Sequence, residues 1–189
     1  DREELAELLR YQTIRKGQIL FRKGDEGTAL FLILRGRIGI VLKVRPDDEI
    51  TLAVLADGDF FGEMALLDGM PRSAEAKALE DTELYILNRT DFLRFLMHNE
   101  RAMQAILYNL SMRLRKTDDL LGETAFLNIS SRLAKRLVEL AESRGIREEG
   151  STHVELNLTQ KELASLVGVS RESINKELKR WRARDLVAT

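Results

Sequence analysis

The sequence predicts an α+β protein, in which a strand-rich antiparallel domain precedes a long helix and a smaller helical domain. Three observations carry this prediction. Glycines punctuate short apolar runs over the first hundred residues, an apolar stripe at helical spacing covers residues 103–124, and two helix signals separated by a glycine cover residues 158–184. We therefore expect domains at residues 1–100, 101–127 and 128–189.

The first domain is expected to be a sandwich or barrel, because its strands are short and closely spaced. A short helix should end within residues 1–10, and residues 45–48 should form a turn between two strands. Thr90 is expected to cap a helix that follows the last strand. The predicted strands are Ile19–Phe21, Leu30–Leu34, Ile38–Leu42, Ile50–Leu55, Ser73–Ala78 and Glu83–Leu87.

A helix from about Arg101 to Thr124 carries an apolar stripe whose steps alternate between three and four residues, as a coiled-coil seam requires. A helix of this length needs a partner for its stripe, and a parallel homodimer is the simplest one. Packing of the stripe against the chain's own β domain is the alternative. The seam residues are Met103, Leu107, Leu110, Leu114, Thr117, Leu121 and Thr124.

Asn128 resembles an N-cap and should begin a helix that runs to about Ser143 and is closed by Gly145. A polar loop is expected at residues 147–152, followed by a short strand within residues 153–158. Phe126, Leu127 and Asn128 then form the hinge between the long helix and the last domain.

Composition excludes several kinds of site. The chain has no cysteine and two histidines, so we expect no disulfide, iron–sulfur cluster, haem or other metal site. We find no catalytic constellation of Ser, His and Asp and no phosphate-binding P-loop, and we do not expect an enzyme. No apolar run is long enough to span a membrane, and the first residues do not form a signal peptide, so we expect a cytoplasmic protein with no membrane partner.

The segment 158–181 has the spacing of a helix-turn-helix. Thr159 can cap the first helix, Ala164 is small where the second helix crosses, and Gly168 permits a left-handed turn. Ser170 can cap the second helix. Val169, Ile174 and Leu178 should be buried.

The outer surface of this second helix suits the major groove of DNA, because arginine can read guanine and glutamate can accept from cytosine. Six basic residues lie between residues 169 and 184, against two glutamates. An ordinary helical hairpin with a solvated charged face is the alternative. The candidate DNA-contacting residues are Thr159, Gln160, Ser170, Arg171, Glu172, Ser173, Lys176 and Lys179.

A second motif lies inside the β domain. Gly62 precedes a short helical turn in which backbone N–H groups can approach an anion, and Arg72 follows ten residues later. Glu63 is then free to accept from sugar hydroxyls. The alternative is a surface loop in which Glu63 and Arg72 pair with each other.

The two motifs, GDFFGEMALLDGMPRSAEA at residues 58–76 and LTQKELASLVGVSRESINKEL at residues 158–178, resemble the cyclic AMP receptor protein / fumarate-nitrate reductase regulator family of bacterial transcription factors. The resemblance covers essentially the whole chain. It implies an N-terminal double-stranded β-roll that binds a cyclic nucleotide, a dimerisation helix and a C-terminal winged helix-turn-helix. The chain ends where the family's wing hairpin continues, so we expect the wing to be truncated.

The resemblance also implies a set of ligand contacts. Glu63 would take the ribose hydroxyl, Arg72 and Ser73 the cyclic phosphate, and Thr117 the adenine amino group. Asp118 stands where the best-known cyclic AMP member has a serine, which affects purine selectivity. The full candidate set for cyclic AMP is Gly62, Glu63, Met64, Ala65, Arg72, Ser73, Thr117 and Asp118.

The resemblance further implies a two-fold symmetric DNA site with TGTGA-like half-sites and RNA polymerase as a partner. Ligand binding would favour one register of the seam, and the hinge would then present two recognition helices about 34 Å apart. Thr117 otherwise only fixes helix register. Two other interpretations remain, a family member that binds DNA without a nucleotide and a cyclic-nucleotide-binding module that acts through protein partners.

Overall fold

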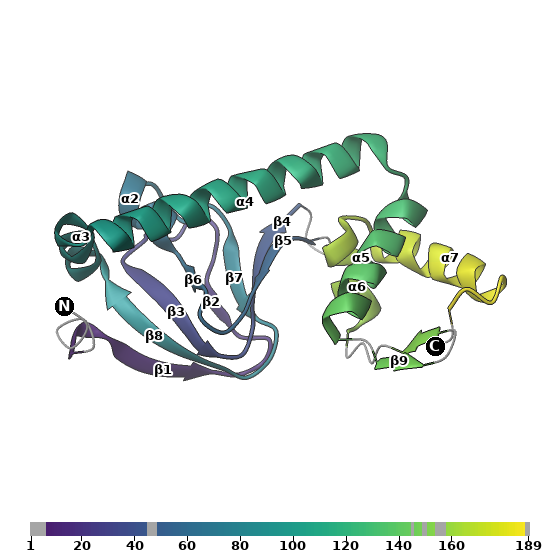
Figure 1. Ribbon diagram of the computed structural model, residues 1–189, viewed down its shortest axis with the longest axis horizontal. Coiled ribbons are helices and arrows are strands. Elements are labelled where there is room, and N and C mark those ends of the chain that lie inside the picture. Colours follow the sequence, from purple (N-terminus) through teal and green to yellow (C-terminus); the bar gives the residue numbers. More distant parts are fainter. Residues whose placement is uncertain (1–6, 45–48, 145, 149–150, 154–157, 188–189) are drawn as a thin grey trace. The chain divides into compact units, whose positions relative to one another are not determined.

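The computed structural model describes residues 7–44, 49–144, 146–148, 151–153 and 158–187, which divide into two compact units. The first unit contains residues 1–42 and 52–115, and the second contains residues 43–51 and 116–189. Figure 1 shows strands and the first part of the long helix in the first unit, and a cluster of short helices in the second. The predicted turn at residues 45–48 lies outside the described residues.

Two four-stranded sheets make up most of the first unit, although residues 43 and 49–51 at the ends of two strands fall in the second. One has the order β1-β8-β3-β6, from Arg10–Ile14, Thr82–Asn88, Ala29–Arg35 and Phe60–Phe61. The other has the order β2-β7-β4-β5, from Ile19–Phe21, Glu75–Ala78, Ile38–Lys43 and Glu49–Leu55. All six predicted strands are present with small shifts at their ends, whereas β1 and β6 were not predicted.

The hydrophobic core lies between these two sheets, as the antiparallel prediction required. Side chains alternate along each strand, so Phe31 and Ile33 of β3 point into this core. Phe21, Phe31 and Phe61 form an aromatic cluster in which the rings of Phe31 and Phe61 stack with centroids 5.2 Å apart. The other buried members are Ile14, Ile38, Leu55, Ala76, Ala78 and Leu84.

Three helices accompany the strands: α2 (Glu63–Asp68), α3 (Arg89–His98) and α4 (Glu100–Phe126). The prediction that Thr90 caps α3 is wrong. Asn88 is the N-cap, and its side chain accepts a hydrogen bond from the backbone N–H of Asp91 at 3.0 Å, which places Thr90 inside the helix. α4 is three residues longer than the predicted helix and is continuous over its 27 residues.

In the second unit, α5 (Ile129–Arg144), α6 (Gln160–Val167) and α7 (Arg171–Arg182) share one core. Asn128 caps α5 as predicted, since its Oδ1 accepts from the backbone N–H of Ser131 at 2.9 Å. The loop expected at residues 147–152 is instead a hairpin of β9 (Ile146–Glu148) and β10 (Ser151–His153). The predicted cap at Gly145 and most of the strand predicted at residues 153–158 lie outside the described residues.

Candidate functional sites

Gly62 and Glu63 mark a sharp change of chain direction between β6 and α2. Gly62 has a φ of 85°, in the left-handed region that favours glycine. A Cβ atom there would lie 2.6 Å from Nη1 of Arg72, so a side chain at this position would displace the guanidinium. The turn directs Glu63 into the protein, where its side chain is fully buried.

Glu63 does not pair with Arg72. Its partner is Arg113, whose Nη1 donates to Oε1 of Glu63 at 2.6 Å. The other terminal nitrogen of Arg113 donates to the backbone carbonyl of Phe60. Oε2 of Glu63 has no hydrogen-bond partner within the described part of the chain, although it is shielded from solvent. A buried carboxylate oxygen without a donor can accept from a ligand hydroxyl.

Arg72 is also buried, with 5% of its surface exposed. Its guanidinium donates to the carbonyls of Gly62 at 2.6 Å and Ala29 at 2.7 Å, and lies 4.2 Å from the centroid of the Phe21 ring. Burial lowers the pKa of Arg72, while the carboxylates of Glu63 and Asp25 act in the opposite direction. Nε of Arg72 is a buried donor without a partner among the described residues.

These contacts contradict the surface-loop alternative, because Glu63 and Arg72 are both buried and neither pairs with the other. Arg113 was not predicted from the sequence, because 50 residues separate it from Glu63 and the periodic signal of its helix is the apolar stripe.

The other candidate ligand residues occupy varied environments. Met64 and Ser73 are exposed and lie together, with Ser73 Oγ 3.8 Å from the sulfur of Met64. Ala65 is buried against Gly27. Thr117 and Asp118 are exposed residues of α4, in the stretch assigned to the second unit.

The predicted seam of α4 divides into two parts. Met103 and Leu110 are partly buried against the cluster formed by α3 and the strands, so the alternative of packing on the β domain holds for them. The exposed fractions of Leu107, Leu114 and Leu121 are 56%, 63% and 65%. Thr117 and Thr124 are exposed as well, so most of the stripe is accessible in the part of the chain that the structure describes.

The helix pair of α6 and α7 has the predicted turn chemistry. Thr159 and Glu162 form a capping box at the start of α6. Gly168 ends α6 with a φ of 71°, and the hydroxyl of Ser170 accepts from the backbone N–H of Ser173 at the start of α7. Ile174 and Leu178 are buried, as predicted, and Val169 packs against the same core.

The outer face of α7 and the start of α6 are accessible. The exposed candidates are Thr159, Gln160, Arg171, Glu172, Lys176 and Lys179, whereas Ser170 and Ser173 are half-buried by their capping contact. α7 also presents Arg180 and Arg182, so its last turn is strongly basic.

The junction between α4 and α5 is held by charges. Glu123, which is buried near the end of α4, accepts from Nζ of Lys135 at 2.5 Å and from Nη2 of Arg136 at 3.0 Å. Beyond it, Phe126 is 88% exposed and α4 ends. Of the predicted hinge residues, Phe126 is therefore the last residue of α4, and Leu127 and Asn128 connect α4 to α5.

Two known protein families match parts of this chain. Residues 11–99 match the cyclic nucleotide-binding domain, and residues 131–189 match the Crp-like helix-turn-helix domain. A CRP-like cAMP-activated global transcriptional regulator from Mycobacterium tuberculosis is 31% identical over 163 residues, which cover 86% of this chain and 73% of the relative. The chain belongs to the cyclic AMP receptor protein / fumarate-nitrate reductase regulator family. It is a transcription regulator with a cyclic nucleotide-binding domain and a DNA-binding helix-turn-helix, and not an enzyme.

Other members of the family are also similar. The cyclic AMP receptor protein of Thermus thermophilus is 35% identical, over 86% of this chain and 72% of its own length. Among solved structures, the c-di-GMP-responsive global regulator CLP of Xanthomonas campestris superposes with a TM-score of 0.88 at 25% identity, covering all of this chain and 93% of that one. The β-roll, long helix and helix-turn-helix of the predicted fold are therefore confirmed.

Two further observations concern the described residues alone. None of the helices formed by these residues combines the length and the hydrophobicity that a membrane span requires. Within the same part of the chain, no group of three or more His, Cys, Asp or Glu side chains is placed to hold a metal ion.

Proposed function

We propose that the protein is a homodimeric, cyclic AMP-controlled regulator that reads a two-fold symmetric DNA site with TGTGA-like half-sites. Control by a nucleotide is inferred from Glu63 and Arg72. Both side chains are buried, and each has a polar atom that lacks a partner in the described part of the chain. Buried polar atoms in native proteins are normally satisfied, so these two favour a polar ligand.

Glu63 and Arg72 offer complementary chemistry to a cyclic nucleotide. Oε2 of Glu63 would accept from the ribose hydroxyl, and the Nε–H of Arg72 would donate to the cyclic phosphate. Ser73 adds an exposed hydroxyl beside the phosphate position. The names of the relatives support cyclic AMP, whereas the responsiveness of CLP to c-di-GMP makes that nucleotide the necessary comparison.

Arg113 connects this site to the dimerisation helix. It holds Glu63 from α4, and Thr117 follows it by four residues, so both lie on one face of the helix. A ligand that changes the Glu63–Arg113 contact would therefore act on the helix that carries Thr117 and Asp118, where the purine base is expected.

A second copy of the chain is the proposed cover for α4. Exposed leucines at positions 107, 114 and 121 recur at a spacing of seven, which fits a two-stranded seam. A dimer then supplies two copies of α7, and Arg171, Glu172 and Lys176 would read base edges in each half-site. The hinge residues 126–128 would set how the two copies are presented.

RNA polymerase is the proposed protein partner, as the transcriptional role requires, and the cytoplasm is the proposed location. The two other interpretations differ in their outcomes. A nucleotide-independent family member would bind the same DNA with or without ligand. A module that acts through protein contacts would not need the basic face of α7.

The test combines two titrations of the purified chain. Calorimetry with cyclic AMP, cyclic GMP and c-di-GMP should give saturable binding of cyclic AMP, and Glu63→Gln should weaken it, whereas binding of c-di-GMP alone would contradict the proposed ligand. Anisotropy with a symmetric TGTGA duplex and a scrambled duplex should show a preference for the first. The logarithm of affinity should fall linearly with the logarithm of salt, with a slope of about −0.9 per phosphate contacted.

A further inference from the structure

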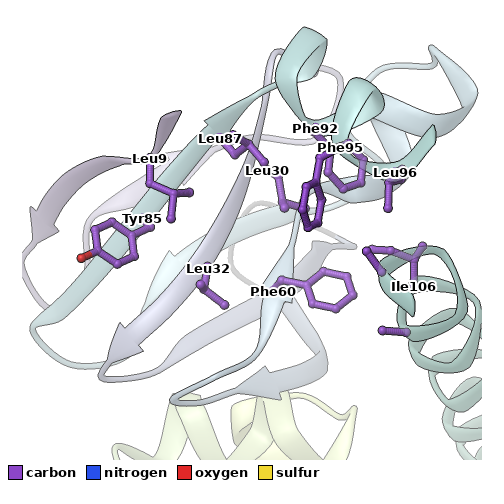
Figure 2. A pocket seen from close by; sticks show the side chains of 12 residues that line it. Leu9, Leu30, Leu32, Phe60, Tyr85, Leu87, Phe92, Phe95, Leu96 and Ile106 are labelled. Carbon is purple, nitrogen blue, oxygen red and sulfur yellow. The ribbon is translucent and has the colours of Figure 1, made fainter. Parts of the chain in front are cut away.

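The first unit contains an apolar cavity whose lining does not include Glu63 or Arg72. It has a volume of about 190 Å³ and lies between the outer face of the β1-β8-β3-β6 sheet and the helices α3 and α4. Figure 2 shows the rings of Phe60, Phe92 and Phe95 converging on it, with Ile106 on the α4 side. Every residue that lines it belongs to the first unit.

Strand alternation explains why this cavity exists. In β3, Phe31 and Ile33 point into the core of the roll, so Leu30 and Leu32 must point to the opposite face. The sheet is therefore apolar on both faces, and its outer face needs cover. α4 supplies small side chains at two of the positions over it, Ala102 and Ala105, which leaves the space unfilled.

The lining defines what the cavity can hold. No charged side chain lines it, and the one polar group among the lining side chains, the Tyr85 hydroxyl, points away from Phe60 and Phe92 (Figure 2). Ala105, on the α4 side of the lining, is exposed, so the cavity opens to solvent there. An engineered apolar cavity of about 150 Å³ in another protein binds benzene, which shows that such a lining suits an aromatic ring. We propose that this cavity is a binding site for a small, uncharged aromatic molecule of one or two rings.

Phe60 connects this cavity to the Glu63 site. Its ring lines the cavity, and its backbone carbonyl accepts from Arg113. The guanidinium of Arg113 lies 5.5 Å from the centroid of the same ring and donates to Glu63. An occupant that moves Phe60 therefore changes the support of Glu63. This coupling, unlike the cavity itself, rests on the proposed nucleotide function.

Indole is a suitable probe, because it is uncharged and has two fused rings. Calorimetry should show saturable binding of indole to the wild-type protein. In NMR spectra of the protein, the methyl resonances of Leu30, Leu87 and Ile106 should shift when indole is added. Indole-3-carboxylate should bind at least about tenfold more weakly, because the lining offers no partner for a buried charge. No saturable binding of indole, or equal affinity for the two compounds, would overturn the site.

Filling the cavity provides the matched test. Ala102→Leu and Ala105→Leu each add bulk to the lining, and each should weaken indole binding at least about tenfold. Gln104→Leu adds a leucine to an exposed position of the same turn and should leave it unchanged. Equal indole affinity in the two filled variants and the Gln104 variant would place the probe elsewhere and overturn the assignment. The second filled variant covers the case in which the first does not fold.

The coupling has its own readout. Saturating indole should change the affinity for cyclic AMP, and cyclic AMP should change the affinity for indole by the same factor. An unchanged cyclic AMP affinity would overturn the coupling. If indole binds and responds to Ala102→Leu while no cyclic AMP binding is found, the cavity is supported and the proposed nucleotide function fails. If cyclic AMP binds normally and indole does not bind, the cavity assignment fails and the proposed nucleotide function is supported.

Discussion

Arg113 of α4 donates to Glu63 of α2 at 2.6 Å, and this contact joins the turn that begins α2 to the long helix α4. The side chain of Glu63 is 1% exposed, and that of Arg113 is 28% exposed. The buried carboxylate of Glu63 is thus paired with a side chain from another element, so a change at Glu63 alters a contact of α4.

Arg113→Ala should destabilise the protein by about 3 kcal/mol, because it leaves the buried carboxylate of Glu63 without a partner. Urea unfolding measures this loss. The exposed neighbour Arg115 provides the control, and Arg115→Ala should change the free energy of unfolding by less than about 0.5 kcal/mol. Combining Arg113→Ala with Glu63→Gln should recover part of the loss. Additive losses in the double variant would show that the pair is not coupled.

Arg72→Ala should weaken the fold as well as the ligand site. The carbonyls of Gly62 and Ala29 would lose their donors in a buried setting, at about 1–3 kcal/mol each. Arg72→Lys retains the charge but not the two-pronged geometry and should lie between Ala and wild type. Thermal unfolding measures the loss of stability. Arg94→Ala, which removes an exposed arginine of α3, is the control. An unchanged melting temperature for Arg72→Ala would contradict the structural role.

Leu114→Glu should convert a dimer to a monomer, because it places a charge in the middle of the exposed apolar stripe of α4. Sedimentation equilibrium gives the molecular mass directly. Arg115→Glu, which lies next to it outside the stripe, should remain dimeric. Identical association of the two variants would mean that the stripe is not the interface.

Arg171→Ala should relax the base preference at one position of each half-site and cost roughly 1–3 kcal/mol in binding to the preferred duplex. Arg182→Ala, at the other end of α7, should instead weaken binding equally across sequences, as a phosphate contact would. Competition with single-base variants of the duplex separates the two. A uniform loss from Arg171→Ala would show that this residue contacts phosphate only.

Lys135 should stabilise the α4–α5 junction in a pH-dependent way. Its hydrogen bond to Glu123 raises the pKa of Lys135 above the ordinary lysine value. The stabilisation is therefore fully present below that ordinary value and is lost as pH rises through the raised pKa. The difference in unfolding free energy between wild type and Lys135→Met should be constant near neutral pH and shrink in strong base. A difference that grows with pH would contradict this sign.

The sequence predicted features that depend on local chemistry. The caps at Asn128, Thr159 and Ser170 and the left-handed Gly168 all follow from short-range backbone requirements, and all are present. The prediction of Thr90 as the N-cap was wrong because Asn88, two residues earlier, also offers a capping oxygen. The backbone N–H of Asp91, three residues after Asn88, donates to it.

Features that depend on distant partners were not predictable in the same way. β1 carries four exposed residues out of five, so it has no apolar alternation, and pairing with β8 is what defines it as a strand. Arg113 is one of several charged residues on α4, and only the fold brings it to Glu63. The apolar cavity likewise needs Leu9, Phe60 and Ile106 together, which are far apart in the chain.

Control of DNA binding by a cyclic nucleotide held at Glu63 and Arg72 can be measured as the affinity for a symmetric TGTGA duplex with and without saturating cyclic AMP at fixed salt. Cyclic AMP should raise this affinity by at least about fivefold in wild type, and the same concentration of cyclic AMP should raise it less in Arg72→Lys. The same affinity with and without cyclic AMP in the wild-type protein would contradict it.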